Sequence, residues 1–161
     1  LTQNRIEVIV SASALHDVGK IAIPDSILLK PGKLTSEEFE YMKLHTTKGC
    51  EILNSIDNAW DDEYGKVSYE ICRYHHERYD GRGYPDGLKE DAIPISAQIV
   101  SIADVYDALV NERVYKNAFT KEKAFRMINE GECGVFSPKI LDCFGNTREE
   151  FEGLAETRRA E

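Results

Sequence analysis

Apolar residues recur along the chain with the three- and four-residue spacing of amphipathic helices. In the segment 4–20, NRIEVIVSASALHDVGK, this spacing places Ile6, Ile9, Val10 and Leu15 near one face. Gly19 follows as a typical end signal for a helix. The pattern therefore predicts a first helix that continues as far as Gly19.

Several later helices are predicted from their start signals. Thr35 and Glu38 have the spacing of a capping box and lead into the apolar segment 49–56, GCEILNSI. Ser96 is placed to cap the most apolar helix of the chain, over 97–110. Two further helices are expected to begin at Thr120 and at the pair Ser137–Pro138.

The segment 66–77, KVSYEICRYHHE, has its apolar residues on a shared stripe and is predicted to be helical. Residues 78–95 are interrupted by glycines and two prolines, so they are expected to form a long loop of the kind that often carries function. No useful run alternates between apolar and polar residues with a period of two. We therefore predict an all-α fold and a single domain over residues 1–161.

Composition narrows the possible functions. The 161 residues have a formal net charge of −9, which disfavours binding of a nucleic acid polymer or of anionic lipid over the whole surface. The four cysteines show no CxxC spacing, and neither a signal peptide nor an apolar run of membrane length is present. We expect a cytoplasmic protein with reduced thiols and no membrane insertion, in which histidines and carboxylates would have to hold any metal.

The histidines are the main candidates for such chemistry, because each lies near a predicted helix end beside polar or acidic residues. They are His16, His45, His75 and His76. Asp17 follows His16 directly, and Asp104 lies inside an apolar helix, where an unpaired carboxylate is costly. A single His–Asp pair is more often a cap or a surface hydrogen bond, and a buried Arg or Lys can compensate Asp104 as well as a cation can.

The joint pattern favours metal binding, because imidazoles and carboxylates together suit Zn, Mn, Fe or Co. On a helix, the neighbours His75 and His76 would point about 100° apart and could serve different ions. Asp17 is then the natural bridge between two ions. Lys20 would share a face with Asp17 if the helix continues, and is placed either to hold an anionic substrate such as a phosphate or to complement the helix dipole.

Six motifs occur in a fixed order: ALHDVGK, IPDSILLKPGKLT, MKLH, YHHERYDGRGYPDGL, IPISAQIVSIADVYDAL and NERVYK. With them the sequence closely resembles the HD-GYP family, a branch of the HD-domain metal-dependent phosphohydrolases that hydrolyses cyclic di-GMP. The similarity extends from about Ile6 to about Phe144, and residues 145–161 are expected to form a helical tail. Residues 73–88 match the HHExxDGxGYP signature of that family.

The resemblance implies a helical HD bundle with two or three divalent ions, most often iron or manganese. The metal ligands that it implies are His16, Asp17, His45, His75, His76 and Asp104. Lys20 would lie near the attacked phosphate, so Asp17 and Lys20 are the expected catalytic residues. Arg113 and Lys116 match positions that contact the nucleotide, and Gly83, Tyr84 and Pro85 form the loop that names the family.

Three departures from the family pattern affect these expectations. In the family, an upstream helix supplies a further Glu and His to the metal centre, whereas only 15 residues precede His16 here and none is a histidine. We therefore expect that helix to be lacking, with fewer bound ions and weak activity of this chain. We also expect an uncovered apolar face along Ile6, Ile9 and Val10 that favours a homodimer. Val114 replaces a proline, and VFSP at 135–138 replaces HFDP.

The leading hypothesis is a phosphodiesterase that converts cyclic di-GMP to linear pGpG or to GMP in bacterial signalling. One alternative is a catalytically weak module whose Gly83–Pro85 loop binds a partner such as a diguanylate cyclase domain. The other alternative is an HD phosphohydrolase for a different nucleotide.

Overall fold

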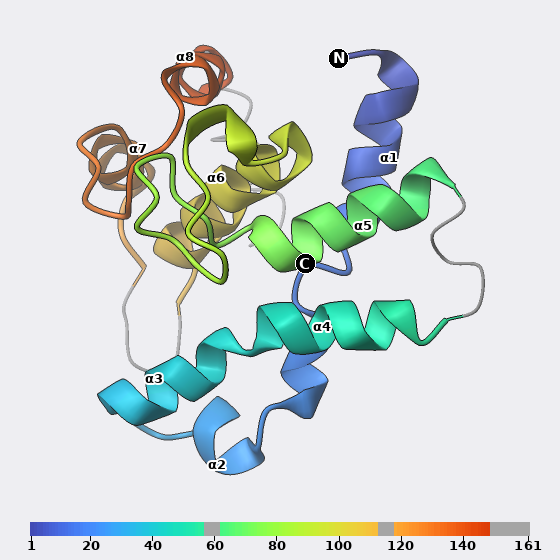
Figure 1. The fold of residues 1–161 in the computed structure, drawn as a ribbon. Coiled ribbons are helices and arrows are strands. Elements are labelled where there is room, and N and C mark those ends of the chain that lie inside the picture. The colour runs from blue at the N-terminus through green and yellow to red at the C-terminus, as the bar shows by residue number, and fades with distance from the viewer. Residues whose placement is uncertain (57–61, 113–117, 149–161) are drawn as a thin grey trace, which may run out of the picture.

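A computed structural model describes residues 1–56, 62–112 and 118–148 (Figure 1). All regular secondary structure in the described residues is helical, with no β-strand among them, which confirms the predicted all-α class. Its helices are α1 (Gln3–Ser13), η1 (Val18–Ala22), α2 (Asp25–Leu28), α3 (Ser36–Lys43), α4 (His45–Asn54), α5 (Glu63–Tyr74), η2 (Glu90–Ala92), α6 (Ile95–Val110), α7 (Lys121–Asn129) and α8 (Pro138–Asn146). None of the described helices is both long and apolar enough to cross a bilayer.

Local capping explains where several helices begin. Thr35 accepts a hydrogen bond from the backbone N–H of Glu38, whose side chain returns a bond to Thr35, so the predicted capping box of α3 is confirmed. Thr120 caps α7 as predicted. The expected cap of α6 was wrong: this helix begins at Ile95, and the hydroxyl of Ser96 donates instead to Glu70 of α5 at 2.6 Å.

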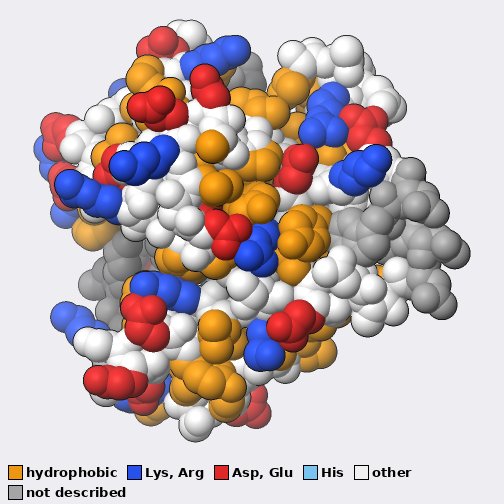
Figure 2. All heavy atoms as spheres, in the orientation of Figure 1, with side chains coloured by type: hydrophobic (Ala, Val, Ile, Leu, Met, Phe, Trp, Pro, Cys, Tyr) orange, Lys and Arg blue, Asp and Glu red, His pale blue; other side chains and the backbone are white. Residues whose placement is uncertain are grey.

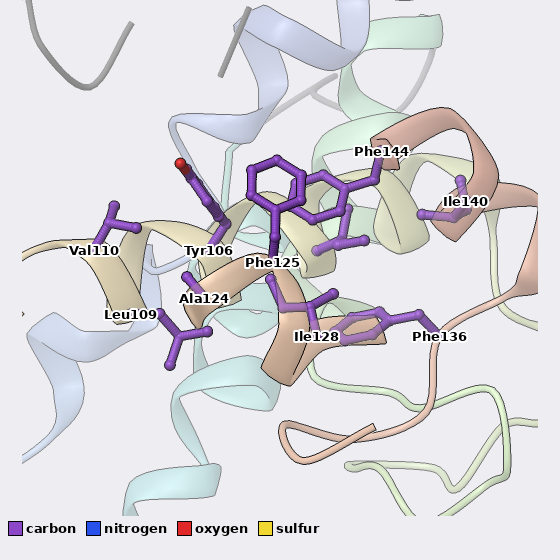
Figure 3. Close-up of a cluster of buried hydrophobic side chains, with 10 residues drawn as sticks. Tyr106, Leu109, Val110, Ala124, Phe125, Ile128, Phe136, Ile140 and Phe144 are labelled. Carbon is purple, nitrogen blue, oxygen red and sulfur yellow. The ribbon is translucent and has the colours of Figure 1, made fainter. Parts of the chain in front are cut away.

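One apolar cluster joins α6, α7 and α8 (Figure 3). Phe125 of α7 stacks on Phe144 of α8, with ring centroids 4.2 Å apart, and meets Tyr106 of α6 at 5.2 Å. Ile128 is 1 % exposed at the centre of the same cluster. These contacts secure α6, the helix that contains Asp104. The expected tail 145–161 begins at the end of α8, and its residues from 149 onward lie outside the described residues.

A second cluster packs α1 against α5 and α6. Ile9 is only 4 % exposed and lies against Val67 and Ile71 of α5, so the expected exposure of Ile9 was wrong. Ile6 and Val10, in contrast, are 41 % and 67 % exposed on the outer side of the helix. The apolar residues of α1 are therefore divided between a buried face and an open one.

The charged side chains are mixed on the surface. On the face shown in Figure 2, Lys and Arg alternate with Asp and Glu, and the described residues form no single basic field there. This distribution fits the acidic net charge of −9 and gives no support to binding of a nucleic acid polymer.

Candidate metal centre

The turn after α1 places His16 and Asp17. The helix ends at Ser13, earlier than the Gly19 predicted from the spacing, and a 3₁₀ helix begins at Val18 with Asp17 as its N-cap. In a 3₁₀ helix the side chains at i and i+3 eclipse each other. Lys20 therefore donates a hydrogen bond to the Oδ2 atom of Asp17 even though the α-helix does not continue.

His45 begins α4 and is brought close to this turn by Gly19. A Cβ added at Gly19 would lie 1.9 Å from the carbonyl oxygen of His45 and 2.4 Å from the backbone nitrogen of Gly49. Only a residue without a side chain allows η1 to pack so closely on α4. The contact fixes Asp17 beside His45.

The end of α5 supplies the next pair of imidazoles. The helix ends at Tyr74 and His75 is its C-cap, so both histidines follow the helix rather than lie within it as predicted. His75 is 1 % exposed, and the ring centroids of His75 and His76 are 4.0 Å apart. The His45 ring is close to both, with its centroid 5.5 Å from that of His75 and 5.1 Å from that of His76.

Asp17 lies at the centre of the site, and its two oxygens face different neighbours. Oδ1 is 3.3 Å from Nε2 of His45 and 3.8 Å from Nε2 of His75. Oδ2 is 3.3 Å from Nε2 of His16, which is in turn 3.9 Å from Oδ1 of Asp104 on α6. The structure thus brings together all six side chains that the resemblance implied as ligands.

Backbone carbonyls orient three of the imidazoles. The Nδ1 atoms of His16 and His45 lie 2.8 Å from the carbonyl oxygens of Ser13 and Met42, and Nδ1 of His75 lies 3.0 Å from that of Ile71. Because a carbonyl only accepts, each Nδ1 carries a proton, and Nε2 of the neutral His45 and His75 is left with a lone pair that faces the site. This arrangement is typical of histidines that bind a metal.

The charge states suit the same role. Burial alone would raise the pKa of Asp17, but hydrogen bonds from His16 and Lys20 outweigh it and hold the pKa far below its usual range. Burial lowers the pKa of His75 to about 3, with further lowering by His16 and His45. At neutral pH the site therefore presents a carboxylate and a neutral buried imidazole, the forms that bind a cation.

The donor set fits a divalent transition metal. Ligand atoms of Asp17, His45, His75 and His76 all lie within 4.8 Å of one another. Oδ1 of Asp17 is buried and has no hydrogen-bond partner among the described residues, which is costly unless a cation satisfies it. A cluster of His and Asp donors that can hold a metal ion is therefore present.

The comparison with protein families agrees with this geometry. The family model described as HD domain matches residues 2–140, most of the chain. The chain belongs to the HD-domain family. Its similar curated proteins include a cyclic di-GMP phosphodiesterase of Vibrio cholerae, 44 % identical over 96 % of this chain and 32 % of that protein. A cyclic di-GMP phosphodiesterase of Thermotoga maritima is 51 % identical over 83 % of this chain and 35 % of its own length.

A third relative is named for a different substrate. The 3'3'-cGAMP-specific phosphodiesterase 2 of Vibrio cholerae is 43 % identical over 94 % of this chain and 28 % of its own length. The chain thus spans about a third of the length of the curated relatives it matches.

Directly after His76, Glu77 has a role that the sequence did not reveal. This carboxylate is 3 % exposed, and it accepts hydrogen bonds from the backbone N–H groups of Asp86, Gly87 and Leu88 at 2.8 to 3.0 Å. Burial raises its pKa, and the three bonds oppose that effect. In the sequence, only its position directly after His76 pointed to a role, because its hydrogen-bond partners lie nine to eleven residues later in the chain.

Arg78 was also missed. Its Nη1 atom donates to the carbonyl oxygen of Glu77 at 2.9 Å and to the hydroxyl of Ser101 at 2.8 Å. Ser101 lies one turn before Asp104 on α6, so this guanidinium links the segment after α5 to the helix that supplies Asp104.

Other expected site positions are placed as follows. The side chain of Lys20 is 41 % exposed at the edge of the cluster. Arg113 and Lys116 lie outside the described residues. Of the altered VFSP residues, Val135 accepts a hydrogen bond from the backbone N–H of Tyr79 through its carbonyl oxygen, and Ser137 is the N-cap residue of α8.

Proposed function

We propose that this HD domain is a metal-dependent phosphodiesterase that hydrolyses cyclic di-GMP to linear pGpG, and to GMP by a second hydrolysis. The observation that supports this most is the position of Asp17, whose Oδ1 faces His45 and His75 while its Oδ2 faces His16. Relatives of 44 % and 51 % identity are named cyclic di-GMP phosphodiesterases, and the HD, HHE and GYP motifs of that branch are intact here. Each hydrolysis consumes one water and breaks one P–O bond of the phosphodiester.

The residues divide into two candidate ligand groups around Asp17. His45, His75 and His76 would hold one ion together with Oδ1, and His16 and Asp104 would hold another together with Oδ2. Bound divalent ions would supply Lewis acidity at the phosphoryl group and at the attacking water. We propose iron or manganese as the metal, and two or three as the number of ions, as the family resemblance implies.

Lys20 is proposed to orient the anionic substrate. Its ammonium group contacts Asp17 at the edge of the candidate metal site, so a phosphoryl oxygen drawn to a cation beside Asp17 would also be near this donor. Charge-assisted hydrogen bonds of this kind favour phosphate over neutral ligands. Arg113 and Lys116 are proposed as further contacts to the nucleotide.

The direct test measures metal content and turnover together. Wild type, Asp17→Asn and the control Asp25→Asn, an exposed carboxylate in α2, are incubated with cyclic di-GMP and either Mn²⁺ or Fe²⁺. We expect wild type and the control to bind metal and release pGpG or GMP, and Asp17→Asn to lose both properties. Absence of turnover with both metals in wild type, or equal metal content in Asp17→Asn, would contradict the proposal.

A second substrate is suggested by the relative that is named as specific for 3'3'-cGAMP. Ions held by these residues would activate water toward any cyclic dinucleotide whose phosphodiester reaches the site. A panel of cyclic di-GMP, 3'3'-cGAMP and cyclic di-AMP, compared by kcat/KM, separates the two candidates. Preference for 3'3'-cGAMP would replace the leading substrate while keeping the reaction class.

Two partner proposals concern other surfaces of the domain. A signalling domain such as a diguanylate cyclase is proposed to contact the Gly83–Pro85 loop, where Arg82 has a side chain 89 % exposed. A second copy of the chain is proposed to cover the open face of α1, where Val10 is 67 % exposed. Analytical ultracentrifugation of wild type and Val10→Lys tests the dimer. A cytoplasmic location stays a prediction.

A further inference from the structure

His76 is held differently from the other three histidines. His16, His45 and His75 each have Nδ1 bonded to a backbone carbonyl oxygen. Among the described residues, no such hydrogen bond orients the ring of His76. Its ring instead stacks on that of Tyr84, with centroids 4.7 Å apart and planes inclined by 28°. The backbone N–H of Tyr84 also donates to the carbonyl oxygen of His76 at 3.3 Å.

The residue before Tyr84 allows this contact. A Cβ added at Gly83 would lie 2.4 Å from Cα of Glu77 and 2.4 Å from the backbone nitrogen of Arg78. The loop therefore lies directly on the backbone that follows His76, and only glycine permits the approach. Tyr84 is thereby brought over the His76 ring.

The residues after Tyr84 are fastened to the same segment. Glu77 accepts the three backbone N–H groups of the turn at 86–88, and Arg73 of α5 forms a two-pronged ion pair with Asp86 at 2.8 and 2.9 Å. Both anchors lie within three residues of His76 in the sequence. The loop and the end of α5 thus form one unit, in which Tyr84 has little freedom to leave the imidazole.

We propose that Tyr84 is a positioning residue for the metal centre, in which its ring sets the orientation of the His76 imidazole and Glu77 holds the loop that places it. This inference rests on the proposed function, because it requires His76 to be a metal ligand. The Gly83–Pro85 loop would then act on the metal centre within the domain, in addition to any contact that it makes with a partner protein. Loss of groups that orient a metal ligand typically lowers metal affinity tenfold to hundredfold.

The test separates the ring of Tyr84 from its hydroxyl. Metal-stripped wild type, Tyr84→Phe and Tyr84→Leu are titrated with Mn²⁺ by calorimetry. Tyr64→Leu is the control, since Tyr64 is 40 % exposed in the first turn of α5, at the far end from His75. We expect Tyr84→Phe and Tyr64→Leu to stay within about twofold of wild type, and Tyr84→Leu to bind at least one Mn²⁺ about tenfold to hundredfold more weakly.

A second variant keeps the inference testable if Tyr84→Leu does not fold. Glu77→Gln retains the size of the side chain and an acceptor oxygen, and is expected to weaken Mn²⁺ binding in the same direction. Where both variants fold, the double variant should be weaker by less than the product of the two separate effects, because both act through the same loop. Independent effects of the two substitutions would contradict the proposed coupling.

Each remaining outcome identifies what has failed. Unchanged Mn²⁺ affinity in Tyr84→Leu, beside a wild type that binds Mn²⁺ and hydrolyses cyclic di-GMP, overturns the positioning role alone. Equal weakening in Tyr84→Phe and Tyr84→Leu assigns the effect to the hydroxyl and also overturns it. A folded wild type that binds no Mn²⁺ overturns both this inference and the proposed function.

Discussion

At the scale of single residues, the proton on each imidazole decides whether the cluster can accept a metal. The carbonyl oxygens of Ser13, Met42 and Ile71 hold the proton on Nδ1 of three histidines. Folding therefore fixes the position of that proton before any metal binds. The site is then ready to bind a cation without rearrangement of those rings.

The same burial makes the metal-free protein sensitive to acid. Burial lowers the pKa of His75 from its ordinary value near 6.5 to about 3, so between these pH values the unfolded chain binds a proton that the folded chain does not. Stability should therefore be complete above pH 6.5 and fall as pH decreases toward 3, by up to about 1.4 kcal/mol per pH unit for one proton.

Urea unfolding at pH 7.5, 6 and 5 measures this slope in wild type and His75→Gln. The variant should lose part of the pH dependence. His76, whose pKa burial also lowers, continues to contribute in the same direction. His16 opposes it, because its hydrogen bond to Asp17 raises its pKa. An identical slope in both proteins would show that His75 is not the group responsible.

Lys20 and Asp17 should differ in what they contribute. Lys20→Ala removes a donor to Asp17 but no ligand atom, so metal content should persist while kcat/KM falls by about tenfold to a hundredfold, as expected for a charge-assisted hydrogen bond of 1.5–3 kcal/mol. Elemental analysis and steady-state kinetics measure the two quantities. Lys48→Ala, which removes a partner of the exposed Glu51 on α4, is the matched control. Metal loss in Lys20→Ala equal to that in Asp17→Asn would contradict the division of roles.

At the scale of elements, the packing of η1 on α4 depends on Gly19. Gly19→Ala would insert a methyl group into the contact with the carbonyl oxygen of His45 and separate Asp17 from that histidine. We expect a loss of about 1–3 kcal/mol in the free energy of unfolding, together with weaker Mn²⁺ binding. Gly32→Ala is the control, since a Cβ there meets nothing within 4 Å. Equal stability and affinity in the two variants would mean that the approach of η1 to α4 is not required.

Elements that depend on local signals were predictable from the sequence. The capping box of Thr35 and Glu38 and the cap at Thr120 involve neighbours three residues apart, and both are present. Ser96 was assigned wrongly because its partner, Glu70, lies 26 residues away on another helix. The apolar spacing after Ser13 could not show that α1 ends there.

In the candidate site, too, the residues were predictable from the sequence, whereas the long-range contacts were not. Residue types and motif order indicated His16, Asp17 and the other candidate ligands, whose proximity the structure shows. The contribution of Glu77 depends on a loop that folds back onto the end of α5, a tertiary feature that no local pattern encodes. The close approach at Gly83 has the same origin.

At the scale of the whole molecule, the candidate ligands come from four separate segments. These are the turn after α1, the start of α4, the end of α5 and the middle of α6. The apolar cluster of α6, α7 and α8 contributes none of them except through α6, to which Asp104 belongs. A bound metal would therefore cross-link the other three segments to α6, while sharing no side chain with that cluster.

This separation predicts how metal binding and core packing combine in stability. Free Mn²⁺ at 100 times its dissociation constant should raise the free energy of unfolding by about 2.7 kcal/mol in wild type and by none in Asp17→Asn. Phe125→Ala should lower it by about 3–5 kcal/mol, because Phe125 is 4 % exposed between α6 and α8. The increment from Mn²⁺ should nevertheless be the same in Phe125→Ala as in wild type, since the two sites share no side chain.

Thermal and urea unfolding with and without Mn²⁺ measure the stability of all three proteins. A metal increment that survives in Asp17→Asn would place the ion elsewhere. An increment that disappears in a folded Phe125→Ala protein would show that the α6–α8 cluster and the metal centre form one cooperative unit.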